Sequence, residues 1–260
     1  MIVETLGQGP ALGLVHGWAM HAGLFAPLVE RLREHCTLHL VDLPGHGHAR
    51  DDARPLDPGA LAGELVDRVP GAVWLGWSLG GQVALRAALD HPQHVRGAIL
   101  VASSPRFVRD EDWPHGVSPT LFSDFGDALK RDFRGTLDGF LALEALGSSS
   151  AQEELRGLRA HAFARGEPAP RALLEGLVLL DSFDVRDELP GLQVPSLWIS
   201  GRRDRLVPAG AMPAAAERTP QARSVVIANA GHAPFLGAAD EVAQEILRFM
   251  AEVAPGHRAS

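Results

Sequence analysis

The sequence has a single cysteine, no tyrosine and only one lysine. The lone Cys36 excludes an internal disulfide framework and a cysteine-based zinc cluster. Without tyrosine, no phenol can act as an acid, a base or a nucleophile. No apolar run reaches the ~20 residues of a membrane-spanning helix, and no basic segment precedes the first apolar stretch. We therefore expect a cytoplasmic protein with neither a membrane anchor nor a secretory signal.

Positive charge is also scarce. Acidic residues outnumber Lys and Arg by 32 to 24, and the formal net charge is −8 at pH 7. An acidic chain is a poor partner for nucleic acid or an anionic membrane. The glycine motifs of nucleotide-binding loops are missing, so no nucleotide site is indicated. His46 and His48 form an H-x-H pair, but no further ligand is spaced to complete a metal site. We expect no metal and no cofactor.

Periodicity in the first hundred residues is typical of an α/β protein. Apolar strand-like runs alternate with stretches that place apolar residues on one helical face. The strand-like runs cover residues 12–16, 37–41, 72–77 and 97–102, and the helical stretches cover 24–32, 61–69 and 79–89. Because the strand-like runs are continuously apolar, they predict strands buried on both faces, as in a parallel sheet flanked by helices.

The strand signal disappears between residues 106 and 187. Helical periodicity covers 119–133, 137–146, 151–163 and 169–180, strand signals return at 196–200 and 224–228, and a last helix is expected over 240–253. We therefore expect one α/β core, residues 1–105 and 188–260, interrupted by a helical cap (lid) at 106–187. Since open α/β sheets bind ligands at the carboxyl ends of their strands, a cap over those ends can build a substrate pocket.

The strongest motif is Gly76-Trp77-Ser78-Leu79-Gly80. It matches G-x-S-x-G between a predicted strand and a predicted helix, the context of a nucleophile elbow. The turn holds the serine in a strained backbone conformation, and its neighbours two residues away must be small so that strand and helix can pack. The motif predicts Ser78 as a catalytic nucleophile.

A nucleophilic serine needs a base and a group that orients the base. His232 follows the last strand signal in Ala-Gly-His-Ala-Pro, and Asp204 follows the preceding strand signal. Both should reach the same end of the sheet as Ser78, in the chain order Ser, Asp, His. Asp181 and Asp184 are weaker candidates for the acid, because neither follows a strand.

An acyl-transfer site must also stabilise an oxyanion. The backbone N–H of Leu79, directly after the nucleophile, is one expected donor. The second is expected from the loop after an earlier strand, which begins His16-Gly17-Trp18. We expect the Trp18 N–H to be that donor, Gly17 to let the backbone turn, and His16 to hold the loop by hydrogen bonds.

These motifs, in this order, resemble the α/β-hydrolase superfamily over nearly the whole chain. The segments LVHGWAM, LHLVDLPGHG, VWLGWSLGG, VASSPRF, FLALEALG and NAGHAPF resemble the BioH family, the pimeloyl-[acyl-carrier protein] methyl ester esterases of biotin synthesis. The resemblance implies an α/β-hydrolase fold with a mostly parallel sheet and a helical cap inserted after the sixth strand. It implies that Ser78, Asp204 and His232 form a triad. It also implies substrate contacts by Trp18, Ser78, Leu79, Phe140, Leu141, Ala142, Leu143, Glu144 and His232.

The resemblance implies an acyl carrier protein as partner. Such a carrier is acidic, so its docking needs local positive charge. Basic residues of the cap that could supply it are Lys130, Arg131, Arg134, Arg156 and Arg159. The family's cap carries arginines at positions that match Gly135 and Gly139, which this chain lacks.

We therefore expect a monomeric serine carboxylesterase that releases methanol from the methyl ester of a carrier-bound pimeloyl chain. A broad carboxylesterase acting on short acyl esters without a protein partner is the main alternative. Cleavage of C–C bonds or lactones in the same fold is another, and a ligand receptor with an inactive pocket is a third. The intact serine, aspartate and histidine motifs weigh against the receptor.

Overall fold

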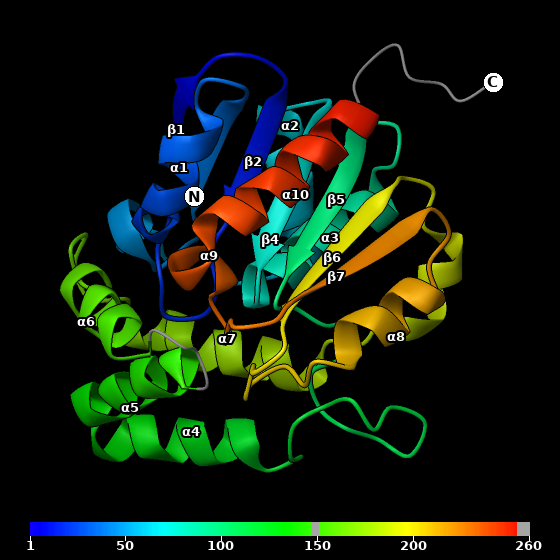
Figure 1. The fold of residues 1–260 in the computed structure, drawn as a ribbon. Coiled ribbons are helices and arrows are strands. Elements are labelled where there is room, and N and C mark those ends of the chain that lie inside the picture. The colour runs from blue at the N-terminus through cyan, green and yellow to red at the C-terminus, as the bar shows by residue number, and fades with distance from the viewer. Residues whose placement is uncertain (147–150, 254–260) are drawn as a thin grey trace.

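The computed structural model describes residues 1–146 and 151–253. Its centre is a seven-stranded sheet covered by helices on both faces (Figure 1). The strands are β1 (Ile2–Gly7), β2 (Ala11–Val15), β3 (Thr37–Asp42), β4 (Ala72–Trp77), β5 (Val95–Val101), β6 (Ser196–Gly201) and β7 (Ala222–Ile227). The helices are α1 (Ala26–Leu32), α2 (Pro58–Arg68), α3 (Leu79–Asp90), α4 (Leu121–Arg131), α5 (Phe133–Ala145), α6 (Ala151–His161), α7 (Pro170–Ser182), α8 (Ala211–Glu217), α9 (Pro234–Gly237) and α10 (Ala239–Glu252). Three short 3₁₀ turns, η1 (Ala22–Phe25), η2 (Gly47–Ala49) and η3 (Arg186–Gly191), join these elements.

The sheet is mostly parallel, which confirms the predicted fold class. Its strand order is β1-β3-β2-β4-β5-β6-β7, and every neighbouring pair is parallel except β1 and β3. The edge strand β1 was not predicted from the sequence. Its side chains are exposed or half-buried along its whole length, so it lacks the continuous apolar run that marks the central strands.

The helical insertion, α4 to α7, lies between β5 and β6. It therefore follows the fifth strand, and its placement after the sixth was wrong. The apolar runs show four strands before the insertion, and the half-exposed β1 adds only one more. The division into a core of 1–105 and 188–260 and a cap of 106–187 stays a prediction, and residues 147–150 and 254–260 of it lie outside the described part of the chain.

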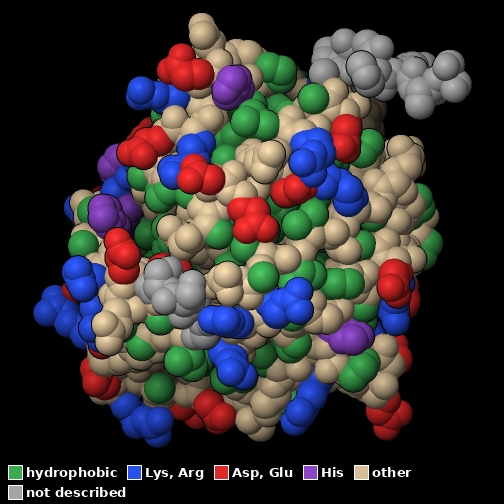
Figure 2. All heavy atoms as spheres, viewed as in Figure 1, with side chains coloured by type: hydrophobic (Ala, Val, Ile, Leu, Met, Phe, Trp, Pro, Cys, Tyr) green, Lys and Arg blue, Asp and Glu red, His purple; other side chains and the backbone are tan. Residues whose placement is uncertain are grey.

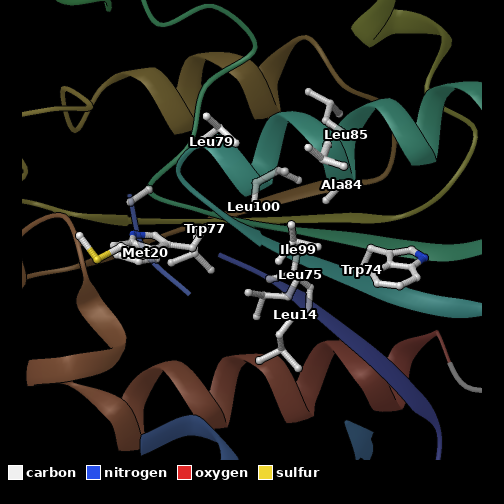
Figure 3. Close-up of a cluster of buried hydrophobic side chains, with 14 of the residues drawn as sticks. Leu14, Met20, Trp74, Leu75, Trp77, Leu79, Ala84, Leu85, Ile99 and Leu100 are labelled. Carbon is white, nitrogen blue, oxygen red and sulfur yellow. The ribbon is translucent and has the colours of Figure 1, made fainter. Parts of the chain in front are cut away.

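Large apolar side chains fill both faces of the central strands. Figure 3 shows Leu14, Leu75 and Ile99 side by side on the face towards α10, while Leu100 points to the opposite face, beneath α3. All six residues of β4 are buried. The fit is close enough to specify glycine: a Cβ on Gly13 would lie 2.0 Å from the Trp74 ring. The rigid centre of the sheet thus fixes where its strands end.

Three central strands deliver the expected site residues to one edge of the sheet. The loops after β2, β4 and β6 carry Trp18, Ser78 and Asp204, and the cap helices lie along this edge (Figure 1). Parallel strands share this carboxyl edge, which is why open α/β sheets bind ligands there. Across residues 1–146 and 151–253, the helices are too short or too polar for any of them to span a membrane.

Candidate active site

Ser78 sits in the sharp turn that joins β4 to α3. Its backbone has φ 53° and ψ −119°, a conformation that costs a non-glycine residue about 1–3 kcal/mol. The surrounding glycines make the turn possible: a Cβ on Gly76 would lie 2.2 Å from the carbonyl oxygen of Gly80, and one on Gly80 would lie 2.2 Å from that of Val15. The hydroxyl of Ser103 donates to the Ser78 carbonyl at 2.8 Å, a support that no sequence motif signalled. The predicted elbow is therefore present, with its serine at the start of a helix.

His232 connects the serine to an acid. Its Nε2 is 2.9 Å from Ser78 Oγ, and its Nδ1 is 2.8 Å from Asp204 Oδ2. His232 is 1% exposed, and its backbone is hydrogen-bonded through both its carbonyl and its N–H. The indole of Trp77 donates to the His232 carbonyl at 2.9 Å, and the backbone N–H of His232 donates to the carbonyl of Glu144 in α5. The ring is thus fixed where it can take a proton from the hydroxyl.

Asp204 is a buried carboxylate whose two oxygens have different partners. Oδ1 accepts the backbone N–H groups of Leu206 and Val207 at 2.8 and 2.9 Å. Oδ2 accepts the Nδ1–H of His232. The carboxylate therefore cannot rotate away from the imidazole without abandoning two backbone donors. The resulting chain of hydrogen bonds, from acid to base to hydroxyl, is the arrangement used for nucleophilic acyl transfer.

The two weaker acid candidates lie elsewhere. Asp184 accepts from Arg106 and Arg186 at 2.8 Å, and both arginines hold its pKa below the ordinary value, although burial opposes this. Asp181 is exposed near the C-terminal end of α7. The hydrogen bond to His232 thus belongs to Asp204.

His16 holds the loop that follows β2. Its Nδ1 donates to the carbonyl of Gly17 at 2.7 Å, and its Nε2 accepts the backbone N–H of Leu43 at 3.1 Å. Burial lowers the pKa of this imidazole to about 3, with a further contribution from the neighbouring His46. His16 is consequently neutral at pH 7, the form in which one nitrogen donates and the other accepts.

The same loop passes directly over the nucleophile. A Cβ on Gly17 would lie 3.2 Å from Ser78 Cβ, so only a small residue fits there. Trp18 comes next in the loop, and Leu79 is the first residue of α3, where backbone N–H groups lack helical acceptors. Both expected oxyanion donors thus belong to segments that meet at Ser78, and their roles stay predictions.

A small apolar cavity of about 20 Å³ opens beside the serine. Its walls are made by Trp18, Ser78, Phe107, Leu121, Phe122, Phe140, Leu180, Leu206 and His232. Aromatic edges close it, since Trp18 meets Phe140 edge-on with ring centroids 4.7 Å apart. Leu206 could have been inferred from its position two residues after Asp204, whereas Phe107 and Leu180 reach the cavity only through the fold.

The predicted substrate contacts on α5 have different positions relative to the cavity. Phe140 lines the cavity, while Leu141, Ala142 and Leu143 follow it along the helix. Glu144 ends the group, and its carbonyl meets the backbone of His232. Substrate binding by the full set stays a prediction.

Glu144 itself is an unusual carboxyl group. Its side chain is 1% exposed, and Oε2 has no hydrogen-bond partner among the described residues. Burial raises the pKa of Glu144 well above its ordinary value, and the negative charge of Asp204 raises it further. Burial therefore favours the uncharged form of Glu144, and that form avoids a second negative charge beside Asp204.

Most of the basic cap residues already have carboxylate partners on the cap. Arg159 donates twice to Asp138, at 2.6 and 2.7 Å, Arg134 lies 2.8 Å from Glu167, and Lys130 lies 3.1 Å from Asp127. Arg131 and Arg156 are exposed, and the described chain offers neither of them an ion pair.

The H-x-H pair has structural contacts. His46 packs against His16 with ring centroids 5.1 Å apart, and its Nδ1 donates to the carbonyl of Pro44. Burial lowers its pKa to about 4. His48 lies 2.7 Å from Glu4 of β1. Cys36 is buried, and burial raises the pKa of its thiol to about 11, as expected for a packed apolar residue.

Comparisons with known proteins agree with this geometry. A family profile described as alpha/beta hydrolase fold matches residues 10–239. The chain is 57% identical to the pimeloyl-[acyl-carrier protein] methyl ester esterase of Xanthomonas oryzae, over 97% of this chain and 100% of that protein. It is 55% identical to the protein of the same name from Stenotrophomonas maltophilia, over 98% of each chain.

Solved structures share the fold at lower identity. An esterase from Exiguobacterium antarcticum superposes with a TM-score of 0.87 at 23% identity, covering 96% of this chain and 94% of that one. The enol-lactonase from Burkholderia xenovorans gives a TM-score of 0.84 at 21% identity, covering 96% of each chain. At these identities the likeness is one of fold.

Proposed function

The chain belongs to the pimeloyl-[acyl-carrier protein] methyl ester esterase family of α/β hydrolases, and we propose that it hydrolyses the methyl ester of a carrier-bound pimeloyl chain in biotin synthesis. The observation that carries this proposal is the buried hydrogen-bonded chain from Asp204 through His232 to Ser78, with distances of 2.8 and 2.9 Å. The substrate is inferred from the family, and the reaction type is inferred from the geometry of the site.

Acylation starts at the serine. His232 Nε2 takes the hydroxyl proton while Ser78 Oγ attacks the ester carbonyl, and Asp204 stabilises the imidazolium that forms. The backbone N–H groups of Trp18 and Leu79 hold the oxyanion, and each such donor is worth about 3 kcal/mol of the barrier. Methanol leaves with the proton from His232, and the pimeloyl chain stays on Ser78 as an acyl-enzyme.

Deacylation repeats the same steps with water. His232 takes a proton from water, hydroxide attacks the acyl carbon, and Ser78 Oγ leaves with that proton. The product carries a carboxylate where the ester was, and a charged group is costly to keep in an apolar cavity. The new charge therefore favours release and spares the thioester at the far end of the chain.

The aromatic wall must move for substrate to enter. A cavity of about 20 Å³ holds little more than one water molecule, whereas ligand pockets usually measure about 300–1,000 Å³. Trp18, together with Phe122 of α4 and Phe140 of α5, lines the cavity beside Ser78. Trp18 is also bound to α7, because its indole donates to the carbonyl of Leu173 at 2.8 Å. Entry of the acyl chain therefore displaces side chains of the cap relative to Trp18.

A carrier protein is the expected partner, because the family's substrate is attached to one. Docking on the basic cap residues, the monomeric state and the cytoplasmic location remain predictions. A broad carboxylesterase would hydrolyse the free and the carrier-bound ester with similar kcat/KM, whereas the proposed enzyme should prefer the carrier-bound ester.

The test compares methanol release from the carrier-bound pimeloyl methyl ester with release from free dimethyl pimelate. We expect kcat/KM to be higher for the carrier-bound ester, and Ser78→Ala to lower kcat at least ~10⁴-fold on both. Rescue of biotin auxotrophy in a strain without its own esterase provides the test in cells. Activity of Ser78→Ala near wild type would overturn the mechanism, and equal rates on both esters would favour the broad carboxylesterase.

A further inference from the structure

Three exposed arginines surround the acid of the triad. Arg202, Arg203 and Arg205 occupy the loop between β6 and α8, and all three side chains are exposed, whereas Asp204 between them is buried. The loop turns Asp204 inwards to His232 and turns its neighbours outwards. The result is a local positive charge on a protein whose net charge is −8. We call Arg202, Arg203 and Arg205 the arginine loop.

Two residues of the arginine loop have charges that no carboxylate offsets in the described part of the chain. Arg202 and Arg205 form no ion pair within residues 1–146 and 151–253. Arg203 donates to the amide oxygen of Asn229 at 3.3 Å. Lys130, Arg134 and Arg159 of the cap differ, because each lies within 3.1 Å of a carboxylate. Charges without a nearby counter-charge produce the stronger long-range field.

The arginine loop also lies at the active site. Leu206, next to Arg205, lines the cavity beside Ser78, and the backbone N–H of Leu206 donates to Asp204. Figure 2 shows basic side chains gathered where Figure 1 places the loop after β6, between the sheet and the cap helices. A partner that docks there stands beside the cavity that its substrate must enter.

We propose that the arginine loop is the docking site for the acidic carrier protein that presents the ester. This inference rests on the proposed function and moves the main electrostatic contact from the cap to the β6–α8 loop. It accounts for Gly135 and Gly139, because a chain with charge on this loop needs less charge on α5. Carboxylates of the carrier would meet the guanidinium groups at the rim, where charge steers association and sets orientation.

Charge reversal tests the docking site. The variant Arg202→Glu/Arg205→Glu should raise KM for the carrier-bound ester at least ~10-fold at low salt and leave its kcat within about 2-fold. Its kcat/KM for free dimethyl pimelate should stay within about 2-fold of wild type, because no carrier is involved. Raising the salt from about 0.02 to about 0.5 M should lower the kcat/KM of the wild type on the carrier-bound ester, because the Debye length falls below 10 Å above about 0.1 M. The difference in kcat/KM between wild type and variant should therefore become smaller at high salt.

Two further variants serve as controls. Arg202→Lys/Arg205→Lys keeps the charge and should retain most of the wild-type kcat/KM. Arg131→Glu/Arg156→Glu makes the same change at exposed cap arginines and should raise KM less than the loop variant does. Thermal melting checks that each variant is folded.

The outcomes separate the docking site from the function. The docking proposal is overturned if the loop variant matches wild type on the carrier-bound ester, if the cap variant has the larger effect, or if the loop variant loses free-ester activity equally. That last result would mean that the arginines act on the triad. A wild type that hydrolyses dimethyl pimelate but gains nothing from the carrier would refute the proposed function, and the docking site with it.

Discussion

Replacing Asp204 with asparagine should stop catalysis by placing a proton on the wrong nitrogen of His232. The oxygen that accepts from Leu206 and Val207, at 2.8 and 2.9 Å, must remain an oxygen. Reversing the amide would leave both buried donors facing an NH₂ group, at about 1–3 kcal/mol for each. The asparagine nitrogen therefore takes the position 2.8 Å from His232 Nδ1 and donates to it. Nε2 then carries the ring proton and cannot accept the one on Ser78.

The expected loss is about 10⁴-fold in kcat, which corresponds to about 5.5 kcal/mol of barrier. The measurement is steady-state hydrolysis of free dimethyl pimelate, accompanied by a melting curve to show that the variant is folded. Asp184→Asn is the matched control: it removes the same charge at a site where Asp184 binds Arg106 and Arg186 and not His232, so kcat should stay near wild type. A folded Asp204→Asn variant with kcat within ~10-fold of wild type would refute this account of the acid.

Three further predictions concern packing and protonation. Gly80→Ala should cost at least about 3 kcal/mol in urea unfolding, because its Cβ would lie 2.2 Å from the carbonyl oxygen of Val15, whereas Gly139→Ala, with open space around it, should stabilise α5 by up to ~1 kcal/mol. The raised pKa of Glu144 means that the native state binds the proton more tightly than the unfolded chain, so the contribution of this group to stability falls as pH rises above ~4.3. Glu144→Gln should therefore gain Tm relative to wild type as pH increases above that value, and a constant difference in Tm would contradict this. The pKa of His46 is lowered to about 4, so its effect on stability runs in the opposite direction: the contribution is complete above ~6.5 and is lost as pH falls towards 4. His46→Asn should therefore flatten the decline of Tm between pH 7 and 5. An unchanged slope would show that His46 does not cause this decline.

Much of the fold and the candidate site could be predicted because their signals are local. Buried parallel strands read as continuous apolar runs, so β2 to β6 were found close to their observed bounds. The elbow could be read from Gly76 and Gly80, since the sterics of a strand–turn–helix junction act within five residues. β1 lacked such a signal, because its side chains are only half-buried and its pairing with β3 joins distant residues.

Local sequence patterns predict the fold class, the nucleophile and the order of the triad, because these depend on short-range sterics and on loops that follow recognisable strands. Packing between distant segments sets which nitrogen of His232 is bound by which partner, how small the cavity is, and that Glu144 is buried where it feels the charge of Asp204. The same packing sets which arginines have carboxylate partners, since Arg159 of α6 contacts Asp138 of α5 whereas Arg202 and Arg205 form no ion pair within the described residues. Such contacts join residues tens to more than a hundred positions apart, and packing alone brings them together.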